Sequence, residues 1–186
     1  RSSRGLGDVY KRQAIRASQL GLKTAIVEKE SLGGVCLNWG CIPTKALLKS
    51  AQVFEYIKKA DTYGLKIKDF DKDFDAVIKR SRDVAGGMSK GVNFLMKKNK
   101  IEVINGYGKI KPNKVVSVEN EGTELDFEAD NIIIATGGRS RVIDSIPQDG
   151  KKIIGYREAM TLQKQPKKMI IAVSYTHLRA HETTDN

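Results

Sequence analysis

Apolar residues along the chain recur with two different periods, and the change between them falls near position 100. Before that point they recur at helical spacing over Lys45–Lys59 and Phe74–Asn99, which predicts two long helices. Gly86, Gly87 and Gly91 interrupt the second pattern, so we expect either a kink there or two shorter helices.

Strand-like runs lie on both sides of this helical region. Before it, Ala14–Leu20 predicts a short helix that Gly21 ends, and Thr24–Val27 predicts a buried strand. After it, strands are predicted over Ile101–Ile104, Val115–Val118, Leu125–Phe127 and the fully buried run Ile132–Ala135. We therefore predict an α/β fold with a parallel sheet, a helix layer and a small antiparallel β-meander.

The last third of the chain carries fewer regular signals. Lys151–Gln165 is predicted to be a connector with a short helix, and the apolar run Met169–Val173 predicts the first strand of a second α/β unit. Neither end, Arg1–Gln13 or Ser174–Asn186, has a period that continues into its neighbour. We interpret both ends as tails that do not belong to the natural domain, and we expect no function from them.

Two motifs within these tails are expected to be coincidences. Gly5 and Gly7 resemble the start of a G-x-G-x-x-G loop, but Tyr10 takes the place of the third glycine and no apolar strand precedes them. His177 and His181 have helical zinc-ligand spacing, but no third ligand is evident. We therefore expect no metal site.

The composition is that of a globular protein, with 40% hydrophobic and 30% charged residues. The net charge of +11 raises the question of nucleic acid, but the lysines are scattered among acidic residues, so we expect no nucleic-acid partner. No apolar run approaches the roughly 20 residues that a membrane span needs.

The chain has only 2 cysteines, which suggests a specific task in a reducing compartment, and we expect a cytoplasmic protein.

The two cysteines, Cys36 and Cys41, are the chief candidates for chemistry. Positions five apart in a regular helix point about 140° away from each other. A disulfide therefore requires that Cys36 precede the helix or that its first turn be distorted, and Gly40 and Pro43 make such a distortion plausible. Because so small a loop gives little stability, a bridge here suggests a chemical role. Two buried free thiols, or half of a metal site, remain alternatives.

The segment around these cysteines, GGVCLNWGCIPTK over 33–45, resembles the redox-active segment of the pyridine nucleotide–disulfide oxidoreductases. The resemblance extends over Ala14–Val173 and includes neither tail. Asn38, Trp39 and Thr44 favour the lipoamide branch of that family. The resemblance implies an incomplete Rossmann-like FAD-binding domain and an oxidoreductase.

The resemblance also implies a role for each matching residue. Cys36 corresponds to the thiol that exchanges with the dithiol substrate, and Cys41 to the thiol that contacts the flavin. Lys45 corresponds to the lysine beside the isoalloxazine ring. Glu28, with Lys29 next to it, corresponds to the carboxylate that accepts hydrogen bonds from the adenosine ribose of FAD.

Further positions correspond to backbone contacts with the cofactor. Gly33 and Gly34 would let the backbone approach FAD closely. Gly108 corresponds to a contact on the adenine side, and Ala135-Thr136-Gly137 to a turn at a strand end near the flavin. By itself each of these signals is weak, and their order around the cysteine motif is what gives them weight.

The chain departs from the family at both ends. The first strand and its G-x-G-x-x-G loop are missing, so 14–168 is expected to be a partial FAD-binding domain, and 169–173 the start of an NAD-binding domain. The family implies that the complete protein is a homodimer that passes electrons from dihydrolipoamide through FAD to NAD. Its implied partner is the lipoamide-bearing protein of a 2-oxoacid dehydrogenase or glycine cleavage complex. We expect the 186-residue chain alone to be inactive.

Two alternatives remain open at this point. The complete protein could belong to another branch of the family, such as the mercuric or glutathione-type reductases. The chain could instead be a non-catalytic flavin-binding or thiol-switch module, which would require that it fold stably by itself.

Overall fold

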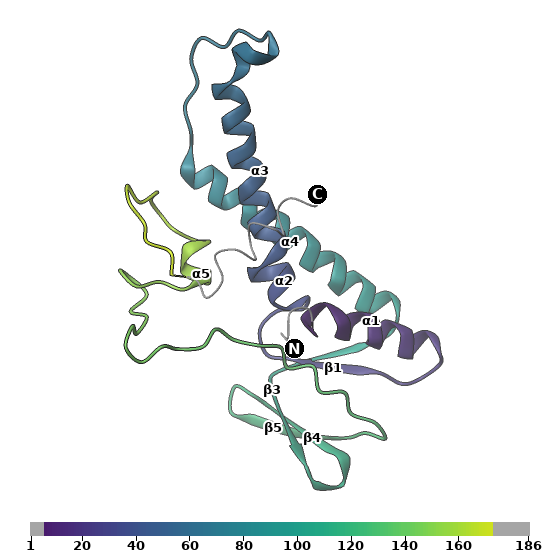
Figure 1. Cartoon of the computed structure of the whole chain (residues 1–186). Coiled ribbons are helices and arrows are strands. Elements are labelled where there is room, and N and C mark those ends of the chain that lie inside the picture. Colours follow the sequence, from purple (N-terminus) through teal and green to yellow (C-terminus); the bar gives the residue numbers. More distant parts are fainter. Residues whose placement is uncertain (1–5, 173–186) are drawn as a thin grey trace.

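The computed structural model describes residues 6–172, which form a helical body with two small sheets at one end (Figure 1). In chain order, the elements are α1 (Leu6–Gln19), β1 (Ala25–Glu28), α2 (Gly34–Trp39), α3 (Cys41–Lys58), the 3-10 helix η1 (Ala60–Tyr63), α4 (Phe74–Lys98), β2 (Glu102–Asn105), β3 (Tyr107–Lys111), the 3-10 turn η2 (Pro112–Lys114), β4 (Val115–Asn120), β5 (Thr123–Glu128) and α5 (Tyr156–Ala159).

The two sheets differ in the direction of their strands. β1 and β2 are parallel, with Ala25 opposite Glu102 and Glu28 opposite Asn105, and α2, α3 and α4 lie in the connection between them. A tight turn makes two neighbouring strands antiparallel. Parallel neighbours therefore need a longer connection that returns the chain to the same end of the sheet. β3, β4 and β5 form an antiparallel meander in that order. The predicted parallel sheet, helix layer and small meander are therefore confirmed.

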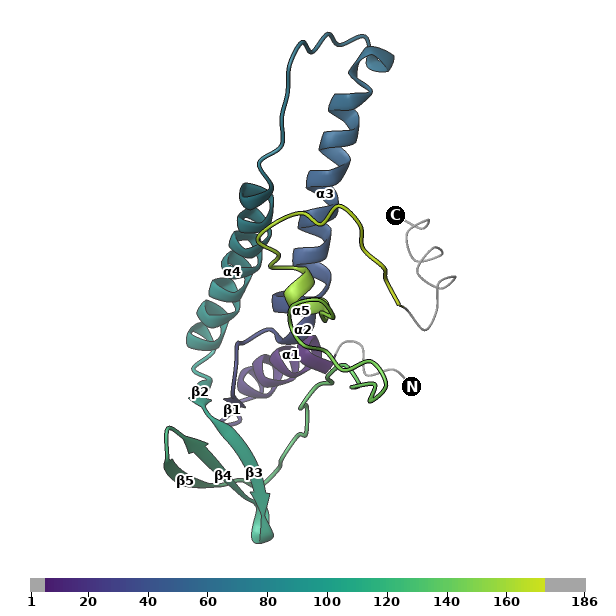
Figure 2. The same cartoon turned by 90° about the vertical axis from the view of Figure 1, so that its left-hand side faces the viewer.

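α3 and α4 pack side by side and project away from the sheets as a long helical hairpin (Figures 1 and 2). The Asp73 carboxylate caps α4 by accepting a hydrogen bond from the Ala76 amide at 2.9 Å. From there α4 runs as one helix of 25 residues through all three of its glycines. The alternative of two shorter helices is wrong, because the buried face formed by Ser81, Ala85, Val92 and Met96 continues past the glycines.

The hydrophobic core lies where α1, β1, α2 and α4 meet. Its fully buried members are Ala14, Ile26, Leu32, Leu37, Val92, Met96 and Ile101. Met96 has only 1% of its surface exposed, which makes it the most deeply buried large side chain of this cluster. The core thus anchors the loop that follows β1 and the short helix α2 against the body of the protein.

α1 is longer than the pattern predicts. It begins at Leu6, whereas the pattern predicts a start at Ala14 and no element that continues from the first 13 residues. The physical reason is that Tyr10 lies one helical turn before Ala14 and packs against the same core. Gly7 therefore lies within a helix and not in a phosphate-binding loop, while Gly5 lies outside the described residues.

Two predicted strands are absent from the described residues. Ile132–Ala135 pairs with neither sheet, and Ile133 and Ile134 are 65% and 67% exposed. Residues 169–172 are likewise without a strand, and Ile170 is 97% exposed. An apolar run becomes a strand only where a neighbouring strand can pair its backbone groups, and these two runs have no such partner here.

Other predictions in the second half are confirmed. β4, β5 and β2 lie at their predicted places, and the connector before Pro166 contains the short helix α5. β3 was not predicted, because its sequence YGKIK is exposed throughout and lacks a clear alternation. Among residues 6–172, no helix is both long and apolar enough to cross a membrane. His177 and His181 lie outside the described residues.

We predict that Met96→Ala destabilises the protein by about 2–5 kcal/mol, because it leaves a cavity in the core. Urea unfolding followed by circular dichroism measures the loss. Met88→Ala is the matched control on the same helix, since Met88 is 50% exposed, and it should change stability by less than about 0.5 kcal/mol. Equal losses for the two variants would contradict the core assigned here.

Candidate redox site

Cys36 and Cys41 form a disulfide across a break between two helices. Cys36 lies in the short helix α2, Cys41 is the first residue of α3, and their Cα atoms are 4.7 Å apart. Gly40, between the helices, has φ −139° and ψ −114°, far from helical values. A Cβ atom added to Gly40 would lie 2.9 Å from the Val35 carbonyl oxygen, so a side chain there would collide with the backbone.

α3 begins immediately after this break. The Gly40 carbonyl accepts a hydrogen bond from the Thr44 amide at 3.1 Å, which closes the first turn of the helix. Pro43 is fully buried in that turn, where its missing N–H is not needed. Cys36 thus precedes the helix that Cys41 opens, which is one of the two arrangements that the spacing requires for a disulfide.

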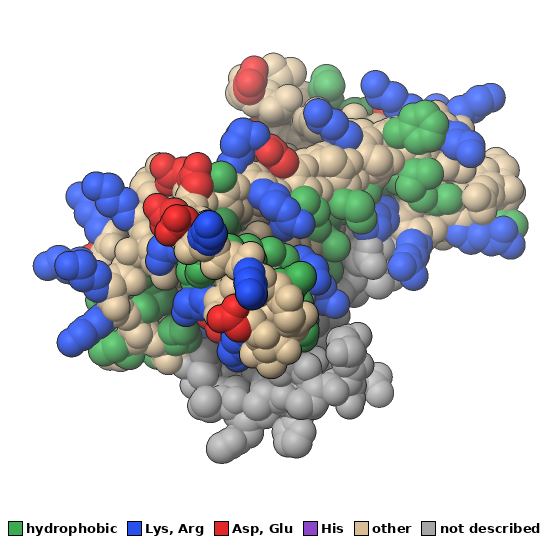
Figure 3. Space-filling model, turned by 90° about the horizontal axis from the view of Figure 1, so that it is seen from above, with side chains coloured by type: hydrophobic (Ala, Val, Ile, Leu, Met, Phe, Trp, Pro, Cys, Tyr) green, Lys and Arg blue, Asp and Glu red, His purple; other side chains and the backbone are tan. Residues whose placement is uncertain are grey.

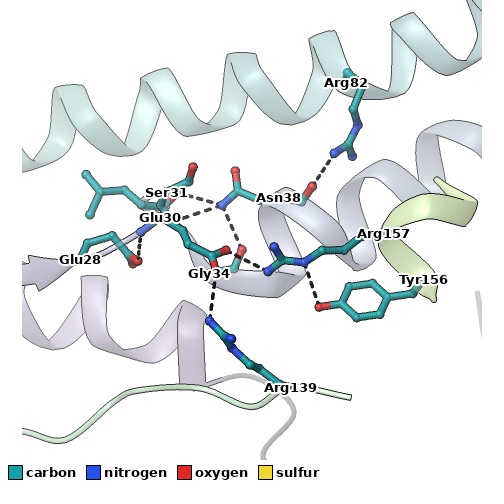
Figure 4. A network of polar contacts seen from close by, with 10 residues as sticks. Glu28, Glu30, Ser31, Gly34, Asn38, Arg82, Arg139, Tyr156 and Arg157 are labelled. Carbon is teal, nitrogen blue, oxygen red and sulfur yellow. Dashed lines mark hydrogen bonds and ion pairs between the residues drawn. The ribbon is translucent and has the colours of Figure 1, made fainter. Parts of the chain in front are cut away.

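The loop before α2 is held by glycine geometry and by the Asn38 amide. Gly33 has φ 104°, and a Cβ atom there would lie 2.6 Å from Leu37 Cδ1, so both its conformation and the close packing require glycine. The Asn38 Nδ2 donates to the Gly34 carbonyl at 3.0 Å and to the Leu32 carbonyl at 3.1 Å (Figure 4). These bonds fix α2 to the loop that follows β1.

Glu28 lies at the end of β1 with its carboxylate directed toward this loop. Its Oε1 accepts from the Glu30 amide at 3.0 Å, and its Oε2 accepts from the Tyr10 hydroxyl at 3.2 Å. The Tyr10 hydroxyl in turn accepts from the Gly33 amide at 3.0 Å. Burial is the main cause that raises the pKa of Tyr10 to about 12, so the hydroxyl stays protonated and can donate to Glu28.

The other predicted residues lie at different distances from the disulfide. Lys45 is exposed on α3, four residues after Cys41, so it shares the helix face of that cysteine. Lys29 turns toward the meander, with its Nζ 5.4 Å from the centre of the Tyr107 ring. Gly108 lies in β3 against β1, where an added Cβ atom would be 3.2 Å from Val27 Cγ1.

Two arginines contact Glu30 in the loop that follows β1. One comes from the segment after Ala135-Thr136-Gly137, and the other comes from the helix α5. Arg139 pairs with Glu30 at 3.4 Å, and Arg157, at the start of α5, pairs with Glu30 at 2.8 Å (Figure 4). Together with Ser140 and Tyr156 these residues line a cavity of about 230 Å³. Gly137 has φ 71° in a stretch without regular secondary structure, and not at the end of a strand as predicted.

Sequence reasoning missed the residues that hold these parts together, which are Tyr10, Glu30, Arg82, Arg139, Tyr156 and Arg157. Arg82 on α4 and Arg157 both lie over the ring of Trp39, at 4.7 Å and 5.1 Å from its centre. The signal that was available is that Trp39 is the only tryptophan of the chain and lies within the cysteine motif. Nothing in the local pattern indicates which distant arginines would reach it.

Charged and apolar side chains are mixed on the face of the described residues that Figure 3 shows. Lys and Arg side chains are spread over the face seen in Figure 3, with acidic and apolar side chains between them. Within 6–172, no group of three or more His, Cys, Asp or Glu side chains is placed to hold a metal ion. Among the described residues, the candidate chemistry lies at the disulfide and at the Glu28 carboxylate.

Residues 12–173 match the family model described as pyridine nucleotide-disulphide oxidoreductase. The chain belongs to this family. Among curated relatives, the dihydrolipoyl dehydrogenase of Zymomonas mobilis is 49% identical over 159 residues, which are 85% of this chain and 34% of that protein. The enzyme of the same name from Bacillus subtilis is 44% identical over 167 residues, 85% of this chain and 35% of that protein. The chain thus spans about a third of the length of these relatives.

A solved structure shares the fold. The crystal structure of LpdA from Mycobacterium tuberculosis superposes with a TM-score of 0.75 at 18% identity, over 88% of this chain and 36% of that one. With the parallel sheet, the helix layer and the meander, this likeness confirms the predicted fold class. The relatives are oxidoreductases by name, which agrees with the class of chemistry that the cysteine motif predicts.

We predict that Gly40→Ala prevents efficient disulfide formation, because the new Cβ atom collides with the backbone at the helix break. Thiol titration after air oxidation should find two free thiols in a large share of the variant and almost none in the unchanged chain. Gly86→Ala is the control, since an added Cβ atom meets nothing within 4 Å there, and it should oxidise normally. A Gly40→Ala protein that oxidises as fast as the unchanged chain would contradict the assigned break.

We also predict a pH-dependent contact between α5 and the loop. The hydrogen bond from Arg157 is the main cause that lowers the pKa of Glu30. A lowered pKa means that the contact stabilises the fold above the ordinary glutamate pKa of about 4.3, and that this stabilisation is lost as pH falls below that value. Trp39 fluorescence, followed from about pH 6 to about pH 3, should report the change, because Arg157 lies on its ring.

Glu30→Gln is the variant that tests this assignment. It should remove the acid transition of the Trp39 signal and give the low-pH signal already at neutral pH. Glu55→Gln, which alters an exposed pair with Lys58 on α3, should leave the transition unchanged. An identical transition in the Glu30→Gln protein would show that another group is responsible.

Proposed function

We propose that Cys36 and Cys41 form the redox-active disulfide of a flavoprotein whose complete form oxidises dihydrolipoamide with NAD. The observation that carries this proposal is the disulfide across the Gly40 break, at the start of an 18-residue helix. It is supported by the family match and by 49% identity to an enzyme named dihydrolipoyl dehydrogenase. A bridge that closes so short a loop adds little stability, so its value lies in its chemistry.

The chain supplies the parts that thiol–disulfide exchange needs. A substrate thiolate attacks the Cys36 sulfur, the Cys36–Cys41 bond breaks, and Cys41 leaves as a thiolate at the N-terminal end of α3, where the helix dipole stabilises negative charge. The second substrate thiol then attacks the mixed disulfide, which releases the cyclic disulfide product and leaves both cysteines reduced. Lys45 lies one turn along the same face and adds a positive charge near Cys41.

The residues present fit FAD at its adenosine end. Glu28 and the Gly33 amide already hold one hydroxyl group, that of Tyr10, between a strand-end carboxylate and a loop N–H. A ribose hydroxyl would make the same kind of bonds, with Glu28 as acceptor. Gly34, Gly108 and Ala135-Thr136-Gly137 are proposed as backbone contacts, and Lys29 as a neighbour of this end. When bound, FAD would accept the electrons of the reduced cysteines.

The remaining parts of the activity are proposed for the complete protein. Residues 14–168 would form part of its FAD-binding domain, and 169–173 would begin its NAD-binding domain. The complete protein would act as a homodimer on the lipoyl group of a 2-oxoacid dehydrogenase or glycine cleavage complex. The support for these proposals is the similarity to proteins of which this chain covers about a third.

We predict that Cys36→Ser and Cys41→Ser each lower dihydrolipoamide oxidation by the complete protein at least about a thousandfold, because each removes an atom that reacts. Lys49→Gln, at an exposed position on the same helix, should keep nearly full activity. The assay is NADH formation followed by absorbance. Substantial activity in either cysteine variant would overturn the proposed function.

A further inference from the structure

Two guanidinium groups from distant parts of the chain lie over the ring of Trp39. The Arg82 Cζ, on α4, is 4.7 Å from the ring centre, and the Arg157 Cζ, on α5, is 5.1 Å from it. Trp39 is the last residue of α2 and is followed directly by Gly40 and Cys41. Contacts of this kind contribute roughly 0.5–2 kcal/mol each, depending on burial. The ring thus ties the end of α2 to two other elements.

Arg82 makes a second contact with the same end of α2. Its Nη1 donates to the Asn38 carbonyl at 2.9 Å, as Figure 4 shows. Its Nε and Nη2 are buried and have no hydrogen-bond partner within the described part of the chain. Buried donors without partners are costly, so the contacts with the Asn38 carbonyl and the Trp39 ring have to offset that cost to hold the side chain here.

These contacts matter most when the disulfide is open. α2 has only six residues, and so short a helix is not stable by itself. In the oxidised chain the S–S bond fixes α2 to α3. In the reduced chain the end of α2 that meets Gly40 is held by non-covalent contacts, of which Arg82 supplies two.

We propose that Arg82 is a positioning residue, which keeps the reduced Cys36 and Cys41 thiols within reach of each other by fixing Trp39 and the Asn38 carbonyl. This inference rests on the proposed function, since it assumes that the disulfide opens and closes. Closing forms the Cys36–Cys41 bond and passes two electrons and two protons to an oxidant such as oxidised dithiothreitol, whose own S–S bond breaks. Without Arg82 the two thiols meet less often, so the closed form becomes less favoured.

A purely structural role for Arg82 predicts a different result. If Arg82 only stabilised the packing of α4, its loss would weaken the oxidised and reduced chains equally and leave their equilibrium unchanged. The thiol–disulfide equilibrium constant therefore separates the two roles, and thermal stability alone does not.

The test uses the 186-residue chain in buffers of reduced and oxidised dithiothreitol, with thiols trapped by alkylation and counted by mass spectrometry. Arg82→Met should lower the equilibrium constant for closing about three- to tenfold, and tenfold corresponds to about 30 mV in reduction potential. Arg82→Lys keeps the charge over the ring and should recover part of the loss. If Arg82→Met leaves the equilibrium constant for closing unchanged while its disulfide opens and closes reversibly, this inference is overturned and the proposed function stays intact.

Arg80→Met is the matched control, because Arg80 lies on the same helix but donates to α3, at 2.8 Å from the Ala46 carbonyl, and not to α2. Its equilibrium constant should stay within about twofold of that of the unchanged chain. If Arg82→Met does not fold, Trp39→Leu removes the ring contacts with Arg82 and Arg157 and should shift the equilibrium constant in the same direction. An unchanged chain whose disulfide cannot be opened and closed reversibly would instead count against the proposed function.

Discussion

The break at Gly40 is the constraint on which the rest of this structure depends. Two cysteines five positions apart cannot meet within one regular helix, and they meet here because Gly40 ends α2 and lets Cys41 open α3 in a new direction. No larger residue fits that position, since a Cβ atom would lie 2.9 Å from the Val35 carbonyl. The same break puts Cys41 at the positive end of a helix dipole, which favours its thiolate. One glycine thus decides whether the bond forms, and in the proposed mechanism it places Cys41 as the sulfur that leaves.

The elements around this break support it from several sides. Leu37 anchors α2 in the core, the Asn38 amide holds α2 to the Leu32 carbonyl in the loop after β1, and Trp39 connects it to α4 and α5. Glu28 is the last residue of β1, directly before this loop. The disulfide and the proposed ribose contact therefore lie on consecutive segments of chain. The parallel pair β1 and β2 fixes where this loop begins. Fold and proposed chemistry are therefore connected through residues 28–41.

Local patterns were sufficient to predict the parts whose cause is local. The helical period of α3 and α4, the meander strands β4 and β5 and the role of glycine and proline near the cysteines all follow from neighbouring residues. Ile132–Ala135 and residues 169–172 show the limit of such patterns, because an apolar run does not form a strand without a partner. Tyr10 and the arginines at 82, 139 and 157 were missed for a related reason. Their contacts join residues 18 to 127 positions apart, and no local period encodes them.

If Cys36–Cys41 is the proposed redox-active bond, a small dithiol opens it while the chain stays folded. The most direct measurement mixes the oxidised 186-residue chain with dihydrolipoamide under native conditions and follows lipoamide formation and protein thiols together. The predicted result is one lipoamide formed and two thiols gained per chain, with the helical signal in circular dichroism retained. Thiols that become accessible to dihydrolipoamide only after the chain is unfolded would contradict the account.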